Sequence, residues 1–136
     1  MSKKLRGTKI GYVYLRKLGG LRRTHRDSVN MGWRNSSFRG FADYMQTPEF
    51  GAGLNRLMKL ASQKRSAIMC AEAVPWRCHR SLIADALTVR GIRVDDIMST
   101  KRSQFHSLTP FARVQGLCIK YPVGDRGRMR QATNRE

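Results

Sequence analysis

The side chains best suited to chemistry gather in one short segment, from Cys70 to Arg80. Thiol, carboxyl and imidazole groups are the usual nucleophiles and general acids or bases of enzymes. A helix that begins within this segment would add free N–H groups and a positive potential, which attract anions and lower the pKa of a nearby thiol. The expected catalytic residues are Cys70, Glu72, Cys78 and His79, and the expected anion-binding residues are Arg77 and Arg80.

A structural role explains the same cysteines equally well. Cys78 shares a helical face with Leu82 and Ala86, and Cys70 ends an apolar run, so both thiols could simply be buried in the core. A phosphatase-type loop is rejected, because the spacing from Cys70 to Arg77 is too long and Glu72 would repel a phosphate. A zinc site is also rejected, because adjacent side chains on a helix point about 100° apart. We expect no metal and no cofactor.

A second candidate region precedes this segment and is rich in aromatic, amide and guanidinium groups. Such groups in a loop suit the recognition of a base or a sugar phosphate. The expected ligand-binding residues here are Trp33, Arg34, Asn35 and Arg39. Phe38 is interpreted as an anchor of the loop, and for Trp33 both interpretations stay open. His25 and His106 have polar, basic neighbours and are expected at the surface.

Strands and helices that would position these groups alternate along the chain. The runs Ile10–Leu15, Ser66–Ala71 and Ile92–Met98 have the composition of strands. A helix is expected over Phe38–Gln46, and a second one starts at Thr47, where a hydroxyl, a proline and an acid follow one another. The order predicts an α/β domain, a mostly parallel sheet with helices packed on it.

The end of the domain is predicted from glycine positions. A helix over Arg77–Arg90 should stop at Gly91, and Ala112–Tyr121 around Gly116 has the pattern of a small C-terminal hairpin. Residues 10–122 are expected to form a single domain. Residues 1–9 and 123–136 are expected to be basic, disordered tails.

Charge and cysteine content point to a class of partner and to a compartment. The 136 residues hold 27 Lys and Arg against 9 Asp and Glu, a formal net charge of +18. Such a charge attracts polyanions, so nucleic acid or a phosphorylated small molecule is the expected partner. The sequence has no apolar run long enough for a membrane span, and its three cysteines lack a disulfide-scaffold spacing. A cytoplasmic location is therefore expected.

The combination of several short motifs resembles the family called domain of unknown function 488. The motifs that carry the resemblance are Gly32–Asn35, Phe38–Met45, Met69–Glu72, Cys78–Arg80 and Leu108–Ala112. The resemblance extends over about Ile10 to Pro122. It implies an α/β sheet domain of bacterial or archaeal type, and it implies no established activity.

The chain also departs from the pattern of that family. Its members usually open with a strand, a helix and a second strand before the equivalent of Ile10, and this unit is absent here. A histidine expected near Tyr14 is missing, and another expected before Ile97 is Asp96. A homo-oligomer or a partner chain that completes the sheet is therefore an expected form of the protein.

Three functional hypotheses follow, and the sequence does not decide whether the protein is an enzyme. In the first, the Cys/Glu/His/Arg pocket binds or processes a nucleotide or another phosphorylated ligand. In the second, the chain is a non-enzymatic module that binds nucleic acid through its basic termini. In the third, it is an inactive, shortened member of the family.

Overall fold

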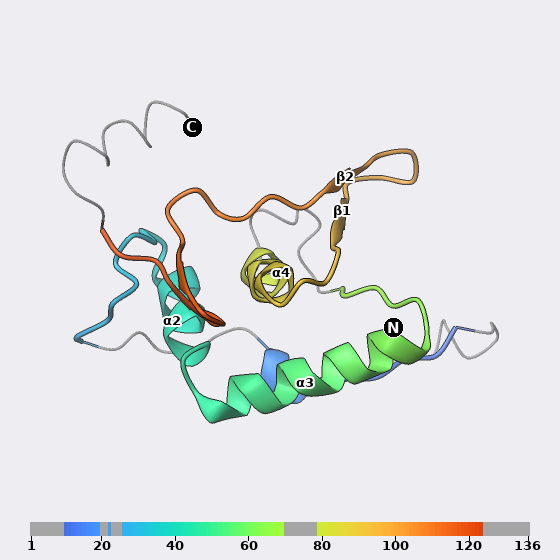
Figure 1. The fold of residues 1–136 in the computed structure, drawn as a ribbon, viewed down its shortest axis with the longest axis horizontal. Coiled ribbons are helices and arrows are strands. Elements are labelled where there is room, and N and C mark those ends of the chain that lie inside the picture. The colour runs from blue at the N-terminus through green and yellow to red at the C-terminus, as the bar shows by residue number, and fades with distance from the viewer. Residues whose placement is uncertain (1–9, 20–21, 23–25, 70–78, 124–136) are drawn as a thin grey trace.

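The part of the chain that the structure describes combines three α-helices with two short antiparallel hairpins (Figure 1). The computed structural model describes residues 10–19, 22, 26–69 and 79–123. In chain order, the elements are η1 (Arg16–Leu18), α2 (Ser36–Tyr44), α3 (Pro48–Gln63), α4 (Arg80–Val89), β1 (Asp95–Ile97), β2 (Ser103–Phe105), β3 (Arg113–Gln115) and β4 (Cys118–Lys120). None of the described helices is long and apolar enough to cross a membrane.

Local capping groups set the helix starts. The side chain of Asn35 accepts hydrogen bonds from the backbone N–H groups of Ser37 and Phe38, and so begins α2. The Thr47 hydroxyl accepts from the N–H of Phe50 at 3.3 Å, with Pro48 in the first position of α3. The predicted start at Thr47 is confirmed, because a cap of this kind depends only on neighbouring residues.

The predicted mostly parallel sheet is wrong. Each described sheet has two strands, and both pairs, β1 with β2 and β3 with β4, are antiparallel. Residues 10–15 and 66–69 have the composition of strands but form none, and Tyr14 and Met69 are 72% and 52% exposed. A strand needs a partner for its backbone hydrogen bonds, and composition does not supply that partner. The third predicted strand, Ile92–Met98, is shorter in the structure. Only Asp95–Ile97 form a strand, β1, and it pairs with β2.

The predicted C-terminal turns are confirmed. Gly91 follows α4 with a φ of 81°, and Gly116 has a φ of 62° in the turn between β3 and β4. Both lie in the left-handed region that glycine enters without strain. The predicted tails, and with them the domain limits, remain predictions, because residues 1–9 and 124–136 lie outside the described part.

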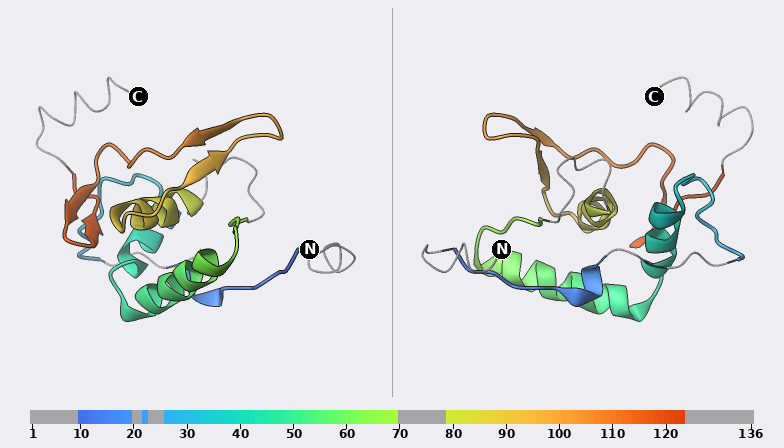
Figure 2. Two further views of the ribbon diagram at one scale, coloured as in Figure 1. Left: turned by 45° about the vertical axis from the view of Figure 1, so that its right-hand side comes forward. Right: turned by 180° about the vertical axis from the view of Figure 1, so that it is seen from behind.

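The hydrophobic core surrounds α4. Figures 1 and 2 show α4 near the centre, between α3 and the β1–β2 hairpin, with the β3–β4 hairpin beside α2. The buried apolar side chains that meet there are Leu18, Phe41, Ala42, Phe50, Leu54, Leu57, Leu82, Ile83, Ala86, Leu87, Ala112, Ile119 and Tyr121. Both candidate regions adjoin this core, through the starts of α2 and α4.

Candidate functional site

The structure describes only the last two residues of the predicted catalytic segment, Cys70 to Arg80. Cys70, Glu72, Arg77 and Cys78 lie outside the described residues, so their catalytic and anion-binding roles stay predictions. His79 and Arg80 are described, and they stand at the start of α4.

His79 occupies a half-buried position between α2 and η1. Its ring lies against Phe41, with 4.9 Å between the ring centroids, and it forms a hydrogen bond with the backbone of Leu18. Burial lowers the pKa of His79 below its usual value, and the positive charges of Arg80 and Arg22 lower it further. The imidazole is therefore largely neutral at neutral pH, as a proton acceptor must be.

The second candidate region forms the turn into α2. Asn35 caps the helix, and the Arg39 guanidinium donates to the carbonyl groups of Trp33 at 3.1 Å and Arg34 at 3.2 Å. These contacts hold the turn together. They leave the predicted ligand-binding roles of Trp33, Arg34, Asn35 and Arg39 as predictions.

Trp33 lies in an aromatic cluster. Its ring makes contacts with Phe38, Phe111 and Tyr121, at centroid separations of 5.0, 4.9 and 5.4 Å. Edge-to-face and tilted ring contacts of this kind stabilise a loop against the core. This arrangement supports the anchoring role of Phe38. Because Phe41 of the same helix packs on His79, α2 positions both candidate regions.

A buried polar network, missed by the sequence analysis, has Asp85 at its centre. Asp85 is fully buried, and its carboxylate accepts from the Thr109 hydroxyl at 2.6 Å, the Thr109 N–H at 3.2 Å and the Tyr121 hydroxyl at 2.8 Å. His106 Nε2 lies 2.8 Å from the same carboxylate. The network ties α4 to the C-terminal segment. The signal that could have revealed it is an acid inside the apolar face of a helix, because a buried carboxylate needs partners.

His106 links this network to β1. The expectation that His106 is a surface group is wrong, because it is only 7% exposed. Its Nδ1 lies 3.0 Å from the carboxylate of Asp96. Each ring nitrogen thus faces a carboxylate oxygen, and only the protonated imidazole can donate from both nitrogens. The hydrogen bond to Asp85 is the largest influence on the pKa of His106 and raises it. Burial lowers the pKa by a smaller amount, and the hydrogen bond and negative charge of Asp96 raise it again.

The stability of the fold should therefore fall as the pH rises. The unfolded pKa of His106 is near 6.5 and the folded pKa is higher, so the stabilisation is fully present below pH 6.5 and is lost as the pH rises through the folded pKa. We expect the difference in unfolding free energy between the wild type and His106→Gln to shrink from about pH 6 to about pH 9 in urea titrations. If the difference in unfolding free energy stays constant over this range, the conclusion that the folded protein holds His106 protonated is wrong.

A second network orders the loop before α2. The Asp43 carboxylate accepts from the Ser28 hydroxyl at 2.6 Å and from the Asn30 amide at 2.8 Å. Asn30 in turn accepts from the Tyr121 N–H at 2.8 Å, and the Gly32 N–H donates to the Tyr121 carbonyl at 2.7 Å. The loop and the C-terminal segment are thus joined through both backbone groups of Tyr121.

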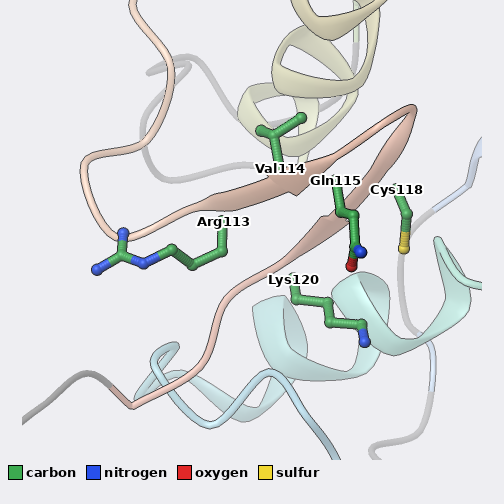
Figure 3. A pocket seen from close by; sticks show the side chains of 5 residues that line it. All are labelled: Arg113, Val114, Gln115, Cys118 and Lys120. Atoms are coloured by element: carbon green, nitrogen blue, oxygen red, sulfur yellow. The ribbon is translucent and has the colours of Figure 1, made fainter.

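A shallow hollow lies on the β3–β4 hairpin (Figure 3). It has a volume of about 240 Å³. The residues that line it are Arg113, Val114, Gln115, Cys118 and Lys120. Two cations, an amide and a thiol line it beside the apolar Val114, so it is positively charged at its rim. Within the described residues, no group of three His, Cys, Asp or Glu side chains could hold a metal ion.

These features define a small, basic domain in which helices pack on a C-terminal segment through buried carboxylates. The family model "Domain of unknown function DUF488" matches residues 1–87, which is more than half of the 136 residues. The chain therefore belongs to this family, and the predicted family assignment is confirmed. The match ends inside α4, so Asp96, His106 and Tyr121 lie outside it. Searches of the curated proteins and of the solved structures found no match.

Proposed function

We propose that this domain binds nucleic acid through contacts between its surface cations and the phosphate backbone. The excess of cations carries the proposal. If each of the 9 acidic residues neutralised one of the 27 Lys and Arg residues, 27 − 9 = 18 cations would still lack a counter-charge. A polyanion is the ligand that neutralises many such charges at once.

The burial of two acids adds to this excess at the surface. Asp43 and Asp85 are 4% and 0% exposed, and both carboxylates accept hydrogen bonds from neighbouring side chains. Their negative charges are thus placed inside the molecule, away from the surface at which a ligand would bind. The solvent-facing layer is more basic than the composition alone indicates.

Binding should depend strongly on salt and weakly on sequence. We expect a fluorescent single-stranded oligonucleotide to bind the full chain at low ionic strength. With about four phosphate contacts, affinity should fall on the order of 50-fold for a fourfold rise in salt. Replacing the four cations of residues 1–9 with serine should lower the slope of log Kd against log salt. Failure to bind at low salt, or a slope near zero, would contradict the proposal.

A nucleotide-sized ligand at the start of α4 is a second candidate. It is favoured by His79, which is neutral and lies close enough to Arg22 and Arg80 for their charges to lower its pKa. Such a site combines cations for a phosphate with a base for proton transfer. In the same assay, a mononucleotide should compete with the oligonucleotide for the protein. His79→Ala should weaken binding of the mononucleotide and leave binding of the oligonucleotide unchanged. The absence of competition would rule this candidate out.

A further inference from the structure

The register of the β3–β4 hairpin places two cationic residues at opposed backbone positions. Arg113 pairs with Lys120, and Gln115 pairs with Cys118. Directly opposed residues of an antiparallel pair project to the same face, and so do residues two apart. These four residues therefore share one face of the hairpin, and all four are exposed.

The opposite face of the hairpin is apolar and contacts the core at one residue. Ile119 projects there and is 4% exposed, whereas its cross-strand partner Val114 is 44% exposed. Figure 3 shows the Val114 side chain leaving the ribbon on the side opposite to Gln115, Cys118 and Lys120. The hairpin thus has an apolar inner face and a cationic outer face.

The outer face carries positive charge and no negative charge of its own. It holds Arg113, Gln115, Cys118 and Lys120, none of which is acidic. Figure 3 shows the charged ends of Arg113 and Lys120 pointing in different directions, so each is available to a ligand. One N–H of the Arg113 guanidinium donates to the Ala112 carbonyl at 3.3 Å. A guanidinium carries five such donors, so most of them remain for a ligand.

The outer face is also held firmly in place. Gln46, which follows α2, donates from its amide nitrogen to the Ile119 carbonyl at 2.7 Å. Its amide oxygen lies 3.2 Å from the Cys118 sulfur. The hairpin, and with it the hollow of about 240 Å³, is therefore attached to the helical part of the fold. A preformed surface loses less entropy when a ligand binds.

We propose that this outer face, formed by Arg113, Gln115, Cys118 and Lys120, is a contact site for the phosphate backbone of a nucleic acid. The proposal rests on the proposed function and assigns part of the binding to a defined surface. Two cations and an amide suit phosphate oxygens, and backbone contacts of this type position a nucleic acid without reading its sequence.

Reversing the charge of one cation tests its effect on ligand binding without disrupting the fold. Lys120 is exposed, so Lys120→Glu should leave the free energy of unfolding almost unchanged. The same change should weaken oligonucleotide binding and lower the salt slope by about 1 or more. Lys101→Glu is the matched control. It makes the same change in charge at the exposed tip of the β1–β2 hairpin, which Figures 1 and 2 show far from β3 and β4.

Alkylation of Cys118 locates the ligand directly. Cys118 is exposed and lies in the hollow, so a bound oligonucleotide should slow its reaction with iodoacetamide, read site by site by mass spectrometry. The protection should disappear in Lys120→Glu and persist in Lys101→Glu.

Three outcomes would overturn the proposal, and they differ from one another. If the oligonucleotide binds but Lys120→Glu behaves like Lys101→Glu and Cys118 is not protected, the hairpin site is wrong and the proposed function stands. If inorganic phosphate, at the same phosphate concentration, protects Cys118 as well as the oligonucleotide does, the site is one for free phosphate. If nothing binds at low salt, the proposed function fails as well.

Discussion

Replacing Asp85 with asparagine should lower the free energy of unfolding by about 3 to 5 kcal/mol, which is the usual effect of removing one partner of a buried charged pair. The carboxylate is fully buried and accepts hydrogen bonds from Thr109 and Tyr121, while His106 faces it with a positive charge. An amide presents one oxygen in place of two, and its NH₂ group would face donors. The buried imidazolium would lose half of its counter-charge.

Urea denaturation, followed by circular dichroism near neutral pH, measures this effect. Asp95→Asn is the matched control, because Asp95 forms an exposed pair with Arg93 at 3.3 Å, and exposed pairs contribute only about 0 to 1 kcal/mol. Small domains have only about 5 to 15 kcal/mol of stability, so the Asp85 variant should lose a large part of it. A loss of stability no greater than that of Asp95→Asn would show that the network does not hold α4 to the C-terminal segment.

A methyl group added at Gly32 should destabilise the fold by about 2 to 3 kcal/mol, because the site has no room for it. A Cβ atom there would lie 2.7 Å from the carbonyl oxygens of Tyr121 and Pro122, and 2.9 Å from the Phe111 ring. Two of these three neighbours are backbone atoms that cannot rotate away. The backbone would have to separate, which would strain the hydrogen bond from the Gly32 N–H to Tyr121.

Gly51→Ala is the matched control, and its expected effect on the free energy of unfolding has the opposite sign. Gly51 lies in α3, and a Cβ atom there would meet nothing within 4 Å. Alanine in a helix should stabilise the protein by about 0.5 to 1 kcal/mol. The two variants should therefore move the thermal midpoint in opposite directions in the same calorimetric experiment. Equal midpoints would mean that Gly32 does not set the close approach of the loop to Tyr121.

Local features of the fold were predictable from the sequence. The capping group at Thr47, the stop at Gly91 and the turn at Gly116 each depend on the conformational preferences of one residue and its neighbours. Family membership was predictable too, because the motifs that carry it are runs of consecutive residues. The positive charge is a property of composition.

The sheet and the interior polar groups were not predictable in this way. Whether Ile10–Leu15 forms a strand depends on a partner that local composition does not specify. The position of His106 depends on Asp85, 21 residues away, and on Asp96. A histidine among polar neighbours in the sequence can be buried by residues that are distant in the chain.

Sequence alone thus determined the start of α3 at Thr47, the glycine turns, the family and the excess of positive charge, because each depends on short-range preferences or on counts of residues. Tertiary structure alone decided which strands pair, which acids are buried with His106 and Asn30, and that Arg113 stands opposite Lys120. These features arise from contacts between distant segments, and such contacts form only when the whole chain packs.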